Sequence, residues 1–349
     1  MPARTEKTAE IRKNKDEKMT DILKFFTDDE RATLARAAKQ IKAAKKIAVI
    51  THMRPDGDAV GSALSLTLAL KNMGKNCVVC DESDLPSNLT FISQAAWLEK
   101  ELPDDADLYI AVDSADIARL GAECDAFRFA GQRATTWNID HHVSNTRYAK
   151  ENFVRVCSAN CMNMLGLLLS LGAKIDKETA NLLMIGLLTD SGDFSHDDVT
   201  EETFAAGAYL TAAGADVATL QYTLFKKQSK ARALLHGETM SRMKFDFDDR
   251  FAYIVITRAM LEKYGADQGA TEGFVDFPLS VDGVEICASV MEVKKGQYKI
   301  SLRSKSYADV NRLAATFGGG GHVRAAGCML SGDLYEVLDR LSYAVSQYL

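Results

Sequence analysis

Four short segments of the chain place histidines and carboxylates at spacings that suit divalent metal binding. The first is His52-Met-Arg-Pro-Asp56-Gly-Asp58, in which Pro55 and Gly57 bend the chain and can turn one imidazole and two carboxylates toward a common point. Carboxylates with an imidazole suit Mn²⁺, and a set without thiolates argues against a structural zinc site. Taken alone, this segment is a weak signal for a metal site.

Asp140-His141-His142 is a stronger signal. Adjacent histidines after an acid are hard to bury in a core, because imidazoles need polar partners there. They find such partners if one histidine binds a metal ion and the other faces a substrate. Asp113 and Asp190 each follow an apolar run, so each is either a helix cap or an inward-pointing ligand, and for Asp113 the two readings are equal alternatives. We assign structural positions to His196 and His236, as is usual for a lone histidine.

The elements expected around these segments form a mostly parallel sheet that would bring the segments to one edge. Strands are expected at residues 46–51, 76–81, 108–113 and 135–140, with helices at 29–44 and 59–73 and a mostly helical stretch at 159–244. Strands that alternate with helices predict a parallel sheet covered on both faces. Ligands gather at the carboxyl ends of parallel strands. The chemistry should therefore collect along that edge.

From residue 251 onward the pattern changes, which predicts a second domain. Strands are expected at residues 251–258, 285–293 and 297–304, and a helix at 309–317 precedes four glycines. Without Cβ atoms, Gly318–Gly321 allow backbone amides to approach an anion or a flat base closely, and the alternative is a flexible interdomain loop. We therefore expect an α/β fold, with a mostly parallel sheet flanked by helices plus a smaller α+β domain, and an active site in the cleft between them. The expected parts are a charged extension (1–28), a catalytic domain (29–227), a helical linker (228–244) and a substrate-binding domain (245–349).

The composition is that of a globular protein and gives no basic surface for long nucleic acid. Of 349 residues, 47% are hydrophobic and 26% are charged, and the formal net charge is −6. Residues 20–228 hold 21 basic and 29 acidic side chains, whereas residues 229–330 hold 14 and 12. A protein that binds long nucleic acid needs a basic surface to displace counterions. A long duplex is therefore not an expected partner.

Membrane and disulfide classes are also not expected. No apolar stretch approaches the ~20 residues of a membrane span, and the first nineteen residues, with six basic and four acidic side chains, lack the apolar core of a secretory signal. Seven cysteines, an odd number, argue against a disulfide framework. Cys77 and Cys80 read as part of a buried strand, because no second pair completes a zinc site. We expect a cytoplasmic protein without a membrane partner, and leave open whether it is a homodimer.

Together, the four segments resemble the ordered motifs of the DHH phosphoesterase superfamily. Those motifs are His-x-x-x-Asp-x-Asp, a strand-end Asp, Asp-His-His and Thr-Asp-(Ser/Thr)-Gly, and they match residues 52–58, Asp113, residues 140–142 and residues 189–192. Residues 301–304 and 318–327 are similar to two substrate-binding motifs of the DHH-associated C-terminal domain. The resemblance covers nearly the whole chain from residue 30, and it is greatest to the NrnA-like nano-RNase group.

The resemblance implies a centre of two Mn²⁺ ions that activate a water molecule for in-line attack on phosphorus. It implies that His142 contacts the scissile phosphate and that Asp140 orients the histidine pair. The implied ligands are His52 and Asp56 on one ion, Asp58, His141 and Asp190 on the other, and Asp113 bridging both. The implied substrate-binding residues are Arg303, Gly318, Gly319, Gly320, Gly321 and His322.

The activity implied by the resemblance is hydrolysis of short oligoribonucleotides (nano-RNA) to mononucleotides and of 3′-phosphoadenosine 5′-phosphate (pAp) to AMP. Its partner would be a short oligonucleotide or nucleotide, which a few local contacts can hold despite the acidic charge. One alternative is a phosphodiesterase of cyclic dinucleotides, either c-di-AMP or its linear product. Another, from a different class, is a nucleotide-binding sensor without catalysis. A sensor would be expected to have lost a metal aspartate, and none is missing.

Overall fold

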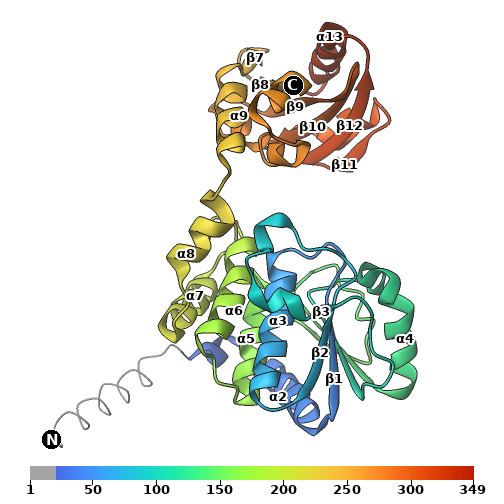
Figure 1. Ribbon diagram of the computed structural model, residues 1–349, viewed down its shortest axis with the longest axis vertical. Coiled ribbons are helices and arrows are strands. Elements are labelled where there is room, and N and C mark those ends of the chain that lie inside the picture. Colours follow the sequence, from blue (N-terminus) through green and yellow to red (C-terminus); the bar gives the residue numbers. More distant parts are fainter. Residues whose placement is uncertain (1–20) are drawn as a thin grey trace, which may run out of the picture. The chain divides into compact units, whose positions relative to one another are not determined.

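The computed structural model describes residues 21–349, which form two compact units that divide between Lys227 and Gln228 (Figure 1). Most of the expected N-terminal extension, residues 1–20, lies outside the described residues. Its remainder belongs to the fold, because Ile22 and Phe26 are buried in the core of the N-terminal unit. Among the described residues, no helix is both long and apolar enough to cross a membrane.

A six-stranded parallel sheet forms the centre of the N-terminal unit. Its strands, in spatial order, are β3 (Leu98–Glu99), β2 (Asn76–Cys80), β1 (Lys46–Ile50), β4 (Leu108–Val112), β5 (Thr135–Asp140) and β6 (Glu151–Val154). The four central strands agree with the strands predicted from the sequence to within one residue. The two edge strands were not predicted, because they are short and mostly half-buried or exposed, and such strands carry little apolar pattern.

Helices cover both faces of this sheet (Figure 1). Successive side chains of β1 enter different cores: Ile47 and Val49 join the larger core, and Ala48 and Ile50 join the smaller one. Burial on both faces is the reason that the central strands read as continuous apolar runs. The larger core involves α2 (Asp28–Ala43), α3 (Gly57–Asn72), α5 (Asn160–Leu171), α6 (Lys177–Asp190), α7 (Glu201–Ala213) and α8 (Val217–Gln221), and the smaller involves η4 (Ile117–Glu123) and α4 (Cys124–Arg133).

Two glycines allow α3 and α6 to pack closely. A Cβ atom on Gly61 would lie 2.5 Å from the carbonyl oxygen of Leu182, and one on Gly186 would lie 2.5 Å from Asp58 Oδ1 and still closer to Cys161 Sγ. No side chain fits at either position unless a neighbour moves. The glycines therefore fix the distance between α6, at whose end Asp190 lies, and the helix that carries Asp58.

The C-terminal unit is built on a mixed six-stranded sheet. Its strands, in spatial order, are β11 (Gly320–His322), β12 (Ala325–Ser331), β10 (Gln297–Ser304), β9 (Ile286–Lys294), β8 (Phe251–Ile256) and β7 (Lys244–Asp246). Only β8 and β9 pair in parallel. Its helices are α9 (Lys230–Ser241), α10 (Arg258–Tyr264), α11 (Asp276–Leu279), α12 (Val310–Ala315) and α13 (Leu334–Val345), with η6 (Gln268–Thr271) between α10 and α11. Of the two alternatives for the four glycines after α12, the flexible loop does not hold for Gly320 and Gly321, because Gly320–His322 pair with β12 as a strand.

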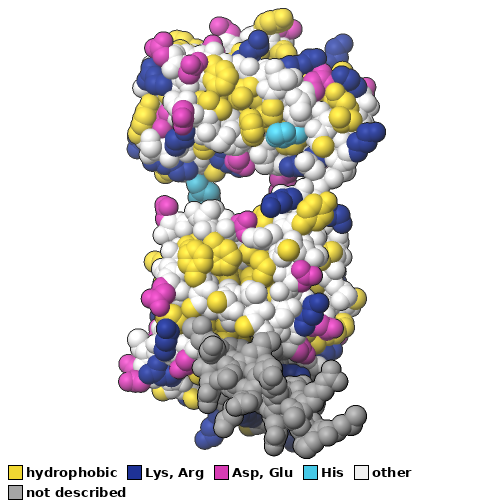
Figure 2. Space-filling model, turned by 90° about the vertical axis from the view of Figure 1, so that its left-hand side faces the viewer, with side chains coloured by type: hydrophobic (Ala, Val, Ile, Leu, Met, Phe, Trp, Pro, Cys, Tyr) yellow, Lys and Arg dark blue, Asp and Glu magenta, His cyan; other side chains and the backbone are white. Residues whose placement is uncertain are grey.

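Charged side chains of both signs are interspersed on the face shown in Figure 2, which presents no continuous band of Lys and Arg.

The remaining helices of the described residues are η1 (Ile22–Phe25), η2 (Ser87–Leu89), η3 (Ser93–Trp97) and η5 (Tyr222–Lys226).

Gly186→Ala should lower the free energy of unfolding of the N-terminal unit by about 1–3 kcal/mol, because the added methyl group presses on Asp58 and Cys161. Gly131→Ala, in the interior of α4, is the matched control. Its methyl group would only touch Thr136 at 3.8 Å, so it should raise that free energy by about 0.5–1 kcal/mol. Urea unfolding followed by tryptophan fluorescence measures both changes, because Trp97 and Trp137 are the two tryptophans of the chain. Parent-like stability of Gly186→Ala would show that the close approach is not required.

Candidate metal centre

The predicted metal-binding side chains meet at the carboxyl edge of the parallel sheet. His52 follows β1, Asp113 follows β4, and residues 140–142 lie at the end of β5. β1 and β4 are adjacent in the sheet. After β1 the chain continues to β2, toward one edge strand, and after β4 it continues to β5, toward the other edge strand. This is the kind of switch point at which open α/β sheets bind ligands.

Three groups of side chains at this edge could each hold a metal ion, and two of them consist of predicted ligands; the third is Asp113, Asp140, His141 and His142. The first group is His52, Asp56 and Asp113, the second is Asp58, His141 and Asp190, and within each group the ligand atoms lie within 4.8 Å of one another. The structure thus brings together all six side chains that the sequence singled out as ligands.

Asp113 lies between the two groups. Its Oδ2 atom is 3.7 Å from His52 Nε2, and its Oδ1 atom is 3.4 Å from His141 Nε2. His52 Nε2 is also 3.9 Å from Asp56 Oδ2, and His141 Nε2 is 3.4 Å from Asp190 Oδ2. Each oxygen of Asp113 therefore faces the histidine of a different group, which is the arrangement that a bridging carboxylate needs.

The two histidines are oriented by the backbone. His52 Nδ1 donates to the carbonyl of Met53 at 3.0 Å, and His141 Nδ1 donates to the carbonyl of Cys157 at 2.9 Å. With the proton on Nδ1, the Nε2 lone pair is free for a cation. Such hydrogen bonds on the far ring nitrogen are usual for histidines that bind metals.

Asp113 is not a helix cap, so of its two predicted alternatives the structure excludes the cap and agrees with an inward-pointing carboxylate. Asp116 caps η4 instead, with its side chain accepting from the N–H of Ala118. Asp113 has a left-handed backbone conformation with φ 54°, which Asp adopts more readily than most residues. Its N–H donates to the carbonyl of Ile139 at 3.0 Å, so β5 holds this turn in place.

Asp56 and Asp58 are fixed by the starts of two different helices. Asp56 Oδ1 accepts from the N–H groups of Asp58 and Ala59, both at 3.0 Å, as the N-cap of α3, and its Oδ2 faces His52. Asp58 is fully buried and accepts from the N–H groups of Asn160 and Cys161 at the start of α5. Helix N-termini stabilise carboxylates. The fold thereby offsets part of the cost of crowding these acids.

The cluster of carboxylates at this edge favours the binding of a cation. Burial and the nearby Asp113 and Asp190 carboxylates raise the pKa of Asp58 well above its usual value. Burial alone would lower the pKa of His141, but the nearby carboxylates of Asp113 and Asp58 raise it to about 10. Within residues 21–349, His52 Nε2 and Asp113 Oδ1 are buried without a hydrogen-bond partner. Oxygen and imidazole donors with unsatisfied buried atoms fit divalent metal ions.

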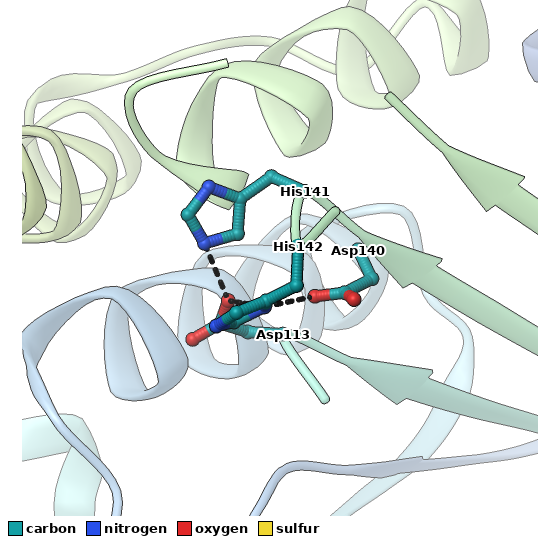
Figure 3. Close-up of side chains that lie close together, drawn as sticks. All are labelled: Asp113, Asp140, His141 and His142. Carbon is teal, nitrogen blue, oxygen red and sulfur yellow. Dashed lines mark hydrogen bonds and ion pairs between the residues drawn. The ribbon is translucent and has the colours of Figure 1, made fainter. Parts of the chain in front are cut away.

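A histidine–aspartate pair lies next to this centre (Figure 3). His142 Nδ1 is 2.8 Å from Asp140 Oδ1 and 3.9 Å from Asp113 Oδ1. The hydrogen bond to Asp140 raises the pKa of His142. Burial opposes ionisation of Asp140, yet its hydrogen bonds with His142 and Asn145 leave its pKa below the usual value. The pair therefore favours a protonated imidazole beside a carboxylate.

Two polar residues at this edge were missed from the sequence. Asn145 Nδ2 donates to Asp140 Oδ2 at 2.6 Å and to Asn138 Oδ1 at 2.7 Å, so it holds the Asp140 carboxylate in place. Asp81 follows β2, is 1% exposed, and has its Oδ2 buried without a partner in the described chain. Burial raises the pKa of Asp81 to about 6. Its position directly after a strand, like that of Asp113, was the available signal.

The predicted substrate-binding residues lie on the C-terminal sheet. Arg303 and His322 are both in register with Ala325, so they belong to one row across three strands. Arg303 Nε forms an ion pair with Asp276 at 3.1 Å. Gly318 and Gly319 precede β11, and Gly320 and Gly321 begin it. The Gly321 N–H donates to Asn311 Oδ1, so at least this amide is already used within the protein.

The two histidines given structural positions lie outside the metal groups. His196 Nδ1 bonds to the carbonyl of Asp190 at 2.8 Å. His236 packs edge-on against Phe274 and Phe277, and its partial burial lowers its pKa.

Stabilisation of the protein by Mn²⁺ should increase as pH rises from 5.5 to 7.5. Burial, with the repulsion of Asp113, raises the pKa of Asp190 to about 7 against the opposing effect of His141. In the metal-free fold the Asp190 carboxyl group therefore keeps a proton that it releases near pH 4 in the unfolded chain. This difference stabilises the fold at low pH, and the stabilisation is lost as pH rises toward 7. Mn²⁺ has to displace this proton, so its binding should strengthen by about 1.4 kcal/mol per pH unit below pH 7.

The shift of the melting temperature at one fixed Mn²⁺ concentration measures this effect at each pH. Asp190→Asn, which has no proton to release there, is the control and should make the pH dependence less steep, while the protons of His141 and Asp58 still have to leave. A shift of equal size at pH 5.5 and 7.5 in the parent protein would contradict the assignment.

Comparison with known protein families gives two matches that together cover most of the chain. The N-terminal domain of the DHH family matches residues 46–187, and the DHHA1 domain matches residues 248–349. The bifunctional oligoribonuclease and PAP phosphatase NrnA of Thermus thermophilus is 32% identical over 310 residues, which are 87% of this chain and 90% of that protein.

Two further similarities extend along the chain. The cyclic-di-AMP phosphodiesterase GdpP of Bacillus subtilis is 24% identical over 90% of this chain, but the match covers only 50% of that protein. The crystal structure of an exopolyphosphatase-related protein from Bacteroides fragilis superposes with a TM-score of 0.77 at 27% identity, and covers 91% of this chain and 96% of that one. Since both domains match and the Thermus relative is similar over nearly the full length of both chains, the protein belongs to the DHH family of phosphoesterases and carries a C-terminal DHHA1 domain.

Proposed function

We propose that the protein is a Mn²⁺-dependent phosphoesterase that hydrolyses nano-RNA to mononucleotides and pAp to AMP. The observation that carries the proposal is the position of Asp113, with one oxygen toward each of two histidine–carboxylate groups. The choice of substrates is supported by the 32% identity to an oligoribonuclease and PAP phosphatase over nearly the whole of both chains.

The proposed ligands divide as the two groups do. His52 and Asp56 hold one Mn²⁺, and Asp113 is shared, while Asp58, His141 and Asp190 hold the other. When bound, such a metal pair lowers the pKa of a water molecule and offsets charge on the phosphoryl oxygens. The protein supplies preformed positions for both ions, because backbone groups already orient the histidines, Asp56 and Asp58.

His142 is the proposed contact to the scissile phosphate. Its Nδ1 donates to Asp140, so Nε2–H remains to donate to a phosphate oxygen. The hydrogen bond to Asp140 raises the pKa of His142 and so favours the cationic ring, which would offset the charge that develops on phosphate. The side chain is 32% exposed, so a substrate can reach it.

Arg303, His322 and the glycines 318–321 are the proposed contacts to a part of the substrate away from the scissile bond. The Arg303 guanidinium is held by Asp276 and by the carbonyl of Leu302, whereas its Nη2 donates to no group among residues 21–349. An oriented guanidinium with free N–H groups is well suited to phosphate.

A second candidate is hydrolysis of a cyclic dinucleotide. One observation favours it, namely the similarity to a cyclic-di-AMP phosphodiesterase along 90% of this chain.

A comparison of rates on one preparation with Mn²⁺ tests these functions. We expect turnover of a diribonucleotide and of pAp that is faster than turnover of c-di-AMP or of its linear product. Asp113→Ala removes the shared ligand and should reduce every rate by at least roughly 10²–10³-fold with the fold intact. Faster turnover of c-di-AMP would favour the second candidate. Binding of all substrates without turnover would identify a sensor instead.

Asn145→Ala should reduce kcat about tenfold or more while KM changes by less than about twofold, because the Asp140–His142 pair loses its support but the metal ligands stay. Stabilisation by Mn²⁺ should be unchanged. Asn152→Ala is the matched control, since the Asn152 side chain hydrogen-bonds only with the backbone of Ala149 in the part of the chain described. Loss of Mn²⁺ stabilisation in Asn145→Ala would mean that Asn145 supports the metal centre itself rather than His142.

A further inference from the structure

One face of the C-terminal sheet is only partly covered. Its β8 end packs under α9 and α10, where Ile254 and Ile256 are fully buried beside Leu235 and Met260. On β10 and β12, by contrast, alternate residues are half-buried or exposed. The opposite face packs against α12 and α13. The open part of the sheet is therefore free to bind a ligand.

The strand register builds a trough across this open part. Directly paired residues project from the same face of a sheet, so the pairing defines rows that cross the strands. One row consists of small residues only: Ser289, Ser301, Gly327 and Gly320. The row on one side of it is Met291, Lys299 and Met329, and the row on the other side contains Arg303, Ala325 and His322. The floor of the trough is low because its own side chains are small.

A cavity of 380 Å³ lies at the β9–β10 end of this trough. Ser289, Ser301 and Lys299 line it from the sheet, together with Arg303, and residues 268–275 line it from η6 and the segment after it. A second cavity, of 410 Å³, is lined by Lys299, Gly327 and the glycines 318 and 319. Lys299 thus borders both spaces.

Two polar groups in the first cavity are without partners. Ser289 is 8% exposed, and its hydroxyl makes no hydrogen bond within residues 21–349. Lys299 forms no ion pair there either, although nearby Arg303 is paired with Asp276. A hydroxyl and an ammonium group that line one cavity and are both free of protein partners in the described chain suit a polar, anionic ligand.

The segment that borders the cavity opposite the sheet is held in place from α9. Arg232 donates to the carbonyls of Ala270 and Glu272, and its guanidinium lies over the ring of Phe274. The cavity is therefore preformed, with Gln268 and Glu272 among its lining residues. Amide and carboxylate side chains can read the hydrogen-bonding edge of a base, and Met291 offers an apolar contact to its face.

We propose that this cavity is a subsite for a nucleoside of the substrate, and that Lys299 binds a phosphate attached to that nucleoside other than the phosphate that is attacked. The proposal rests on the proposed function of the protein as a hydrolase of short nucleotides. A cavity of this size is in the range of small-ligand sites. Arg303 also lines this cavity, so the subsite extends the contacts expected from the sequence rather than replacing them.

Titration of the metal-free protein in EDTA with pAp tests the subsite without hydrolysis. Lys299→Met should weaken pAp binding about tenfold, whereas Lys295→Met, in the β9–β10 turn and outside the cavity lining, should change it by less than twofold. Ser289→Leu fills the cavity and should weaken pAp binding at least tenfold while the melting temperature stays equal or rises. If Ser289→Leu unfolds, Lys299→Met, on an exposed position, decides alone.

The same variants are then assayed with Mn²⁺. Both should raise KM for a diribonucleotide five- to tenfold with little change in kcat, and should leave hydrolysis of bis(p-nitrophenyl) phosphate unchanged. Parent-like pAp binding in both variants, or no pAp binding by the parent protein, overturns the subsite even if the parent hydrolyses dinucleotides. If both variants bind pAp more weakly but the parent protein hydrolyses no nucleotide, the subsite is supported and the proposed function is refuted.

Discussion

Repulsion between carboxylates at the edge of the parallel sheet is the constraint on which the N-terminal unit depends. Asp56, Asp58, Asp113 and Asp190 converge there with two histidines, and Asp58 and Asp113 are almost completely buried. Buried like charges disfavour ionisation. The fold offsets part of this cost with helix N-termini and imidazoles, and divalent cations would offset the rest. The centre is therefore a place where stability and function make opposite demands.

The surrounding structure serves to hold these charges in place. The glycines of α3 and α6 bring the two helices close enough for Asp58 and Asp190 to share one site. Arg155 extends the support outward, because its N–H donates to the carbonyl of Asp140 while its buried guanidinium pairs with Glu202. The guanidinium also donates to the carbonyl of Phe25. The segment that begins the described chain is thereby linked to the strand that carries the histidine pair.

The two faces of the C-terminal sheet differ in role: one stabilises the unit by packing, and the other is the proposed substrate-binding face. One face consists of apolar residues that pack on α12 and α13. The other face carries Lys299, Ser301 and Arg303 on alternate positions of β10, and the residues in line with Ser301 on β12 and β11 are Gly327 and Gly320. The glycine-rich segment therefore has two roles, since it forms an edge strand and also keeps the floor of the trough low. A loop alone would not have provided such a surface.

The sequence by itself predicted which side chains converge at the candidate metal centre. His52, Asp113 and residues 140–142 directly follow or end predicted parallel strands, and the carboxyl ends of parallel strands meet at one edge whatever the details of packing. The apolar runs of the central strands and the amphipathic pattern of α2 carried enough periodicity to place them within a residue or two.

Only the tertiary structure decided how the atoms of that centre are arranged. The division of the Asp113 oxygens between two histidines, the role of Asn145 and the burial of Asp81 depend on rotamers and on contacts between segments far apart in the chain. The row that joins Ser289, Ser301, Gly327 and Gly320 depends on strand register. A single strand shows which residues share a face, but it carries no record of which residues of its neighbours lie opposite them.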